Sequence, residues 1–232
     1  EQDYTRGPEG RAVILLAIPM MLEMSMESLF AIVDIAFVAS LGADAVAAVG
    51  LTEATLTLLY ALAVGLSVGV TATVARRVGE QDLAGARRAA GQAVWLGLAI
   101  AAAIGTAGLA FGADILRLMG ASDAVVARGT GFTTLMLGGS GTIVFLLNGV
   151  FRGAGDATIA MRSLWLANGV NIVLDPCLIF GWGPFPELGV TGAALATNIG
   201  RGTGVAYQVW HLARGRGRLH LRAADLVPEP AV

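Results

Sequence analysis

The chain has 232 residues, of which 56% are hydrophobic and 14% are charged, and its formal net charge is −2. Soluble domains carry about 25% charged residues, so the composition excludes an ordinary soluble domain and indicates an integral membrane protein. The one cysteine, Cys177, excludes an internal disulfide.

A helix that spans a bilayer needs about 20 apolar residues. The sequence contains six such stretches and therefore predicts an all-α fold, an integral membrane bundle of six transmembrane helices. Their approximate ranges are 12–40, 45–75, 89–112, 124–150, 162–181 and 189–213. We expect residues 1–11 to form an N-terminal tail, 12–213 the bundle, and 214–232 a basic linker or tail.

All basic residues are arginines, and with six spans 12 of the 15 fall on one side of the membrane. They precede the first span, lie in the second and fourth connections, and follow the sixth span. Because positive charge marks the cytoplasmic side, we predict that both termini are cytoplasmic and that the protein resides in the inner (plasma) membrane.

The first span, 12–40, carries three acids within an apolar sequence. At about 100° per residue, Glu23, Glu27 and Asp34 fall on one face of a helix. Acids facing lipid are costly, so this face should look into the bundle or a water-filled cavity and handle protons or cations. The alternative for the two glutamates is a place near the membrane edge or in buried hydrogen bonds. Pro19 predicts a bend in the same helix.

The fifth span places Asn168, Asn171 and Asp175 on one helix face. Pro176 cannot donate a backbone hydrogen bond, which predicts a free carbonyl one turn earlier. Carboxylate, amide and carbonyl oxygens suit a hard cation such as Na⁺. A cluster of hydrogen bonds between helices explains the same residues equally well.

Polar residues also occur in the fourth and sixth spans, at Asn148, Thr197 and Arg201. Arg201 is either a counter-ion for an intramembrane acid or a side chain that reaches the interface, and we favour the counter-ion. A further pattern, GAGD at 153–156, matches the G-x-G-D motif of intramembrane aspartyl proteases. It lies in a predicted loop rather than in a span, so it favours that enzyme class only weakly.

Five ordered segments resemble the multidrug and toxic compound extrusion (MATE) family. They are IVDIAFVASLGADAVAAVGL, GLSVGVTATVARRVGEQD, FRGAGDATIAMR, NIVLDP and ELGVTGAALAT, and the resemblance runs from about Ile14 to His211. Family members usually have twelve spans in two six-helix bundles, and this chain is similar to the N-terminal bundle. The second bundle is then lost, on another chain, or replaced by a second copy of this one.

The resemblance implies roles for individual residues. Asp34, Asp175, Asn171, Asn148 and Thr197 match a cluster that is proposed to bind a proton or Na⁺ in family members. Pro19 matches a hinge in the first helix.

Other positions depart from the family or carry no family role. Glu27 stands where glutamine is common, and adds a titratable group. Glu23, Asn168 and Arg201 are further candidates for the polar cavity or for coupling. Na⁺, if bound, would contact Asp34, Asp175 and Asn171.

The resemblance implies a cation-coupled antiporter, not an enzyme, that exports organic or cationic drug-like compounds. Its expected partners are the bilayer, a small organic substrate, and a second six-helix half or a homodimer partner, with no nucleic acid. We expect no cofactor beyond the coupling ion, H⁺ or Na⁺. The alternatives are a non-transporting fragment or assembly subunit of a split transporter and, less favoured, a lipid-precursor flippase or the aspartyl protease.

Overall fold

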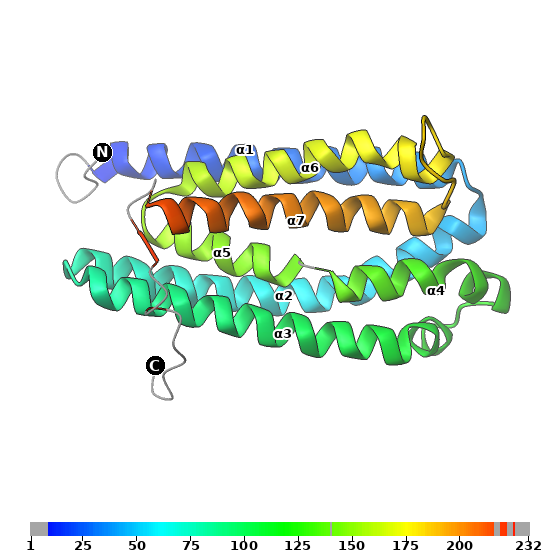
Figure 1. The fold of residues 1–232 in the computed structure, drawn as a ribbon, viewed down its shortest axis with the longest axis horizontal. Helices are drawn as coiled ribbons and strands as arrows, with labels where there is room; N and C mark the ends of the chain where they lie inside the picture. The colour runs from blue at the N-terminus through cyan, green and yellow to red at the C-terminus, as the bar shows by residue number, and fades with distance from the viewer. Residues whose placement is uncertain (1–8, 140, 216–218, 222–224, 226–232) are drawn as a thin grey trace.

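The computed structural model describes residues 9–139, 141–215, 219–221 and 225, so most of both predicted tails lies outside the described residues. The described part is built from helices (Figure 1). In chain order they are α1 (Glu9–Ala39), α2 (Ala43–Gly79), α3 (Leu83–Leu118), α4 (Asp123–Gly138), α5 (Gly141–Gly153), α6 (Ala157–Phe180) and α7 (Val190–Arg214).

The fourth predicted span, 124–150, consists of two successive helices, α4 and α5. The backbone of Gly139 is extended (φ −77°, ψ 171°), and its N–H donates to Met136. The carbonyl of Leu135 instead accepts a 2.8 Å hydrogen bond from the side chain of Asn198 in α7. A side chain of α7 therefore supplies the hydrogen bond that the Leu135 carbonyl lacks within its own helix. Backbone polar groups inside a membrane need such partners, because lipid supplies none.

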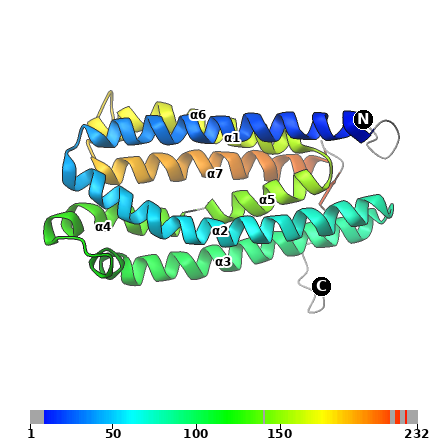
Figure 2. The same cartoon turned by 180° about the vertical axis from the view of Figure 1, so that it is seen from behind.

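The predicted all-helical membrane bundle is confirmed. Among the described residues, five segments are long and apolar enough to cross a membrane: α1 from Val13, α2, α3, the α4–α5 segment and α6. The sixth predicted span, 189–213, forms α7 but is not among these five. α7 packs against α6, α4 and α5, and it lies beside α6 in both views (Figures 1 and 2). Because protein covers much of α7, its composition need not be as apolar as that of a lipid-facing helix.

One end of the bundle gathers the arginine-rich connections. The start of α1, the α2–α3 turn and the end of α7 lie at this end (Figures 1 and 2). The last turn of α2 carries Arg76 and Arg77, and the last turn of α7 carries Arg214. We call this the arginine end. The predicted positions Arg6, Arg216, Arg218 and Arg222 lie outside the described residues.

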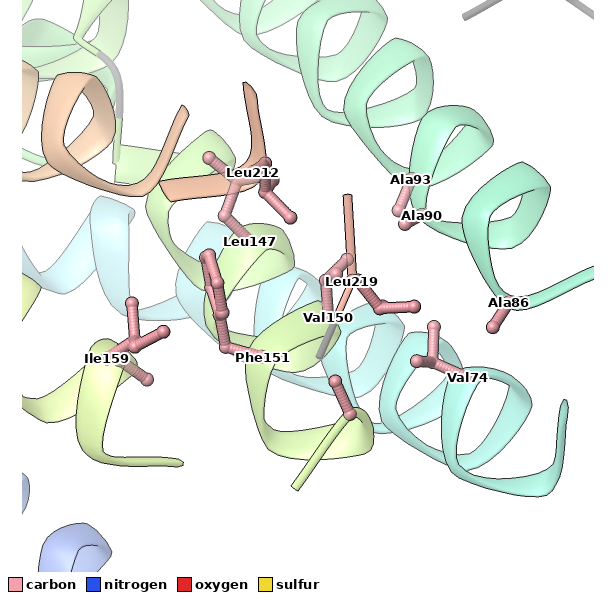
Figure 3. Close-up of a cluster of buried hydrophobic side chains, with 12 residues drawn as sticks. Val74, Ala86, Ala90, Ala93, Leu147, Val150, Phe151, Ile159, Leu212 and Leu219 are labelled. Carbon is pink, nitrogen blue, oxygen red and sulfur yellow. The ribbon is translucent and has the colours of Figure 1, made fainter. Parts of the chain in front are cut away.

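Two apolar clusters fill the bundle, one toward each end. The cluster near the arginine end includes Val74, Leu147, Phe151 and Leu212 (Figure 3). The second cluster, near the other end, is centred on Val49, Phe132 and Ile179, with further residues from α1 and α7. The polar candidates of α1, α6 and α7 lie along the helices between these clusters.

Candidate functional site

Four polar side chains from three helices form what we call the aspartate cluster: Asp34 of α1, Asn171 and Asp175 of α6, and Thr197 of α7. The Asn171 amide donates to Thr197 Oγ1 at 3.0 Å and to Asp175 Oδ1 at 3.4 Å. Asp175 is completely buried and Asn171 is nearly so. The carboxyl groups of Asp34 and Asp175 are close enough for their charges to interact. Hydrogen bonds thus join three of the five predicted cation-site residues, and Asp34 lies within range of the charge of Asp175.

Within the part of the chain that the structure describes, three buried oxygens of the aspartate cluster have no hydrogen-bond partner. They are Oδ1 of Asp34, Oδ1 of Asn171 and Oδ2 of Asp175. Buried polar atoms normally have a partner, so each of these oxygens is available to another group. Two carboxylates and an amide oxygen have the chemistry of a site for a proton or a hard cation such as Na⁺. The residues therefore fit the predicted coupling ion.

A second polar group, which we call the glutamate cluster, consists of Glu23 of α1, Asn148 and Arg152 of α5, and Gln208 of α7. Glu23 Oε1 accepts a hydrogen bond from the Arg152 guanidinium and another, at 3.1 Å, from the Asn148 amide. Gln208 in turn donates to Asn148 Oδ1. Glu23 is 5% exposed, so its negative charge is buried next to a positive one.

The two clusters are separated along the bundle. The α1 acids Glu23 and Asp34 are eleven positions apart in the sequence, which corresponds to about 16 Å along a helix. The same spacing separates Thr197 from Gln208 on α7. The structure consequently does not bring Asn148, the fifth predicted cation-site residue, to the aspartates. Instead, the side-chain nitrogen of Asn148 donates to Glu23, and its side-chain oxygen accepts from Gln208.

Further charged groups lie between the two clusters. Glu27 accepts a 3.3 Å hydrogen bond from Asn168, so these two predicted cavity residues do meet. Arg201 donates to the hydroxyl of Tyr60, and its guanidinium lies 5.2 Å from the centre of that ring. The observed partner of Arg201 is therefore Tyr60, and its role as a counter-ion for an intramembrane acid stays a prediction.

Sequence reasoning missed several of these residues. Glu53 of α2 is half-buried, and its charge acts on both Asp34 and Arg201. Glu53 is the single acid within the apolar stretch 45–75, and this isolated charge is the sequence signal that could have identified it. Arg152 follows the predicted fourth span, 124–150, so the sequence predicts that it lies in the connection after that span. In the structure it lies in the last turn of α5 and pairs with Glu23.

A cavity of about 260 Å³ adjoins the glutamate cluster. Glu23, Glu27 and Arg152 line it together with apolar side chains such as Met24 and Phe145. Two acids and one arginine leave this cavity with an excess of negative charge. Such a lining suits a small organic group that carries a positive charge.

The GAGD pattern forms the turn between α5 and α6. Gly155 has a φ of +82°, which glycine adopts without strain. Its N–H donates to the Arg152 carbonyl, and the N–H of Asp156 donates to Phe151. These bonds close the end of α5 as a glycine-capped helix terminus does. The turn therefore explains Gly155, whereas Gly153 lies at the end of α5, where an added Cβ would come within 2.6 Å of the Thr71 carbonyl oxygen.

Comparison with protein families identifies the chain. The MatE family model matches residues 19–177, which is more than half of the sequence. The chain belongs to the MatE family. The resemblance to multidrug and toxic compound extrusion transporters is thereby confirmed, and the members of this family are transporters rather than enzymes.

Two curated MatE relatives illustrate the range of similarity. A probable multidrug resistance protein, NorM, of Thermotoga maritima is 33% identical over 207 residues, which cover 85% of this chain and 43% of that protein. An FAD transporter of Shewanella oneidensis is 29% identical over 193 residues, which cover 82% of this chain and 43% of that protein. The chain thus spans less than half the length of these relatives.

Solved MatE-type structures share the fold. A transporter of the MOP superfamily from Pyrococcus furiosus superposes with a TM-score of 0.87 at 33% identity. The match covers 97% of this chain and 50% of that structure. The six predicted spans together therefore correspond to half of a solved transporter.

Proposed function

We propose that this chain is the N-terminal six-helix half of a cation-coupled antiporter that exports organic, often cationic, compounds. The observation that carries the proposal is the aspartate cluster, in which three buried oxygens lack hydrogen-bond partners. Acids inside a membrane bundle commonly form proton or ion pathways. The relatives named as multidrug proteins support export of drug-like compounds.

The coupling ion, H⁺ or Na⁺, binds at Asp34 and Asp175 with help from Asn171. A proton on either aspartate, or a Na⁺ between them, relieves the repulsion of the two carboxylates. Because Asp34 belongs to α1 and Asp175 to α6, occupation of the site changes the contact between these helices. An ion exchanges for substrate only if it binds two conformations differently, and Pro19 in α1 supplies the proposed hinge.

The proposed orientation places the arginine end in the cytoplasm. The arginines in the last turns of α2 and α7 support it, since cytoplasmic loops of membrane proteins are enriched in Lys and Arg. In this arrangement both termini are cytoplasmic, residues 1–11 and 214–232 are cytoplasmic segments, and the membrane is the inner (plasma) membrane. The proposed working unit also contains a second six-helix bundle, either another half or a second copy.

Efflux from proteoliposomes tests this function. The protein is reconstituted with the six-helix partner that crosslinking identifies, and dye export is driven separately by a proton gradient and by a Na⁺ gradient. We expect Asp34→Asn and Asp175→Asn to abolish coupled export, because each removes a carboxylate of the aspartate cluster. Asp114→Asn is the matched control, since Asp114 forms an exposed ion pair with Arg117.

The outcomes separate the proposal from its alternatives. Export that persists undiminished in Asp34→Asn under both gradients would refute the assigned site. A reconstituted assembly that inserts correctly but exports nothing under either gradient would favour a non-transporting subunit.

A further inference from the structure

An open groove of about 650 Å³ runs between α2 and α3. Small residues of α2 form one wall, and they include Gly65, Gly69 and Thr73. The other wall is formed by α3, where Trp95 and Leu96 remain exposed. A Cβ atom added at Gly65 or Gly69 would meet nothing within 4 Å, so the hollow results from missing side chains.

The groove leads toward the arginine end of the bundle. Between Thr73 on α2 and Gln92 on α3 the chain contains four arginines and two acids. The acids form solvent-exposed ion pairs with the first two arginines, Glu80 with Arg76 and Arg77, and Asp82 with Arg77. Exposed pairs of this kind are weak, and a phosphate can compete for Arg77. Arg77 lies four residues beyond Thr73, and Arg88 lies four residues before Gln92. Residues four apart share a helix face, so both arginines continue the walls of the groove.

We propose that this groove binds an anionic phospholipid. One acyl chain lies along Gly65, Gly69 and Leu96, and the phosphate lies near Arg77 and Arg88. The excess of arginine at the groove's end matches a negatively charged headgroup, because basic residues next to a span attract anionic lipids. Thr73 and Gln92 stand between the apolar and basic parts, at the depth of the lipid's ester groups.

A second groove of the same molecule provides an internal comparison. It measures about 610 Å³ and lies between α3 and α4, with Gly105, Leu109 and Asn198 among its lining residues. At the end beyond it, α3 carries Asp114 and Arg117 and α4 carries Asp123 and Arg128, so two acids balance two arginines. This groove has similar apolar space without an excess of positive charge, and therefore should not prefer an anionic lipid.

Native mass spectrometry of the purified protein, with its six-helix partner, tests the proposal. Phosphatidylglycerol and phosphatidylcholine with identical acyl chains are the probes. We expect preferential retention of phosphatidylglycerol, which Arg77→Gln and Arg88→Gln each weaken about fivefold. Gly69→Leu should abolish retention by filling the groove. Gly50→Leu is the matched control, because Gly50 is also exposed on α2 with nothing within 4 Å of an added Cβ.

Two results would overturn this proposal. One is equal retention of the two lipids by the unaltered protein, which would indicate apolar contact without headgroup recognition. The other is retention of phosphatidylglycerol by Gly69→Leu at the level of Gly50→Leu. Circular dichroism of both glycine variants verifies that helix content is kept. The outcome does not depend on transport, so a failure here leaves the proposed function standing.

Discussion

The aspartate cluster and the glutamate cluster contain similar groups but satisfy their charges differently. In the glutamate cluster, the positive charge that neutralises Glu23 is a covalent part of the protein, Arg152. In the aspartate cluster, Asp175 accepts a hydrogen bond from the neutral amide of Asn171. One oxygen of Asp34 and one of Asp175 have no hydrogen-bond partner among the residues that the structure describes. Glu23 is thus paired with a cation that belongs to the protein. Asp34 and Asp175 can instead bind a cation that exchanges with the solvent.

This difference suggests a division of labour within one bundle. Burial of an acid in a membrane does not by itself create an ion site, because an internal arginine can satisfy it permanently. The glutamate cluster joins α1, α5 and α7 through hydrogen bonds near the arginine end. Coupling is proposed for the aspartate cluster, because an acid has to lack a fixed partner in order to exchange an ion.

The largest expected effect on stability comes from removing the fixed cation. Arg152→Ala leaves the buried carboxylate of Glu23 without its counter-ion, and we expect a loss of about 3 kcal/mol of unfolding free energy. Unfolding in mixed micelles, followed by circular dichroism, measures it. The double variant Glu23→Gln with Arg152→Ala should recover much of the loss, because both charges are then absent.

Arg117→Ala is the control for this comparison. Arg117 pairs with Asp114 at 3.1 Å, but both side chains are more than half exposed, so its removal should change stability little. Equal losses in the Arg117 and Arg152 variants would show that the glutamate cluster does not depend on its ion pair.

A smaller effect is expected where α7 approaches α6 beside the aspartate cluster. A Cβ at Gly200 would lie 2.4 Å from the carbonyl oxygen of Ala167 and 3.2 Å from Cβ of Asn171. Gly200→Ala should therefore destabilise the protein by about 1–3 kcal/mol and displace Asn171. Gly202→Ala, two residues away with nothing within 4 Å, should be neutral or slightly stabilising. The same micelle unfolding experiment compares them.

The smallest effect concerns a single hydrogen bond of the aspartate cluster. Thr197→Val keeps the shape of the side chain but removes the oxygen that accepts from Asn171 at 3.0 Å. Hydrogen bonds between membrane helices contribute about 0.6 kcal/mol on average, and we expect a loss of that size. Thr203→Val is the control, because the hydroxyl of Thr203 donates to the Ile199 carbonyl within the same helix. A larger loss at Thr203 would contradict the proposed importance of the α6–α7 contact.

Much of the fold followed from local sequence. Long apolar stretches predicted the helices, and the arginine pattern predicted which connections share an end, because bilayer thickness and charge act on each segment separately. The interruption between α4 and α5 was missed, although the run LGGSG at 137–141 contains the signal. That break depends on Asn198 of another helix, whose amide reaches the Leu135 carbonyl.

The sequence by itself determined that Glu23, Glu27 and Asp34 share a face of α1, and that Asn171 and Asp175 share a face of α6, because helical periodicity fixes directions within one element. Only the tertiary structure decided the partners: Arg152 and Asn148 for Glu23, Asn168 for Glu27, and the vicinity of Asp175 for Asp34. Periodicity contains no information on how far a neighbouring helix is shifted along the bundle. The packing of whole helices sets this displacement along the bundle. The displacement in turn decides whether a buried charge lies beside an opposite charge or has no partner.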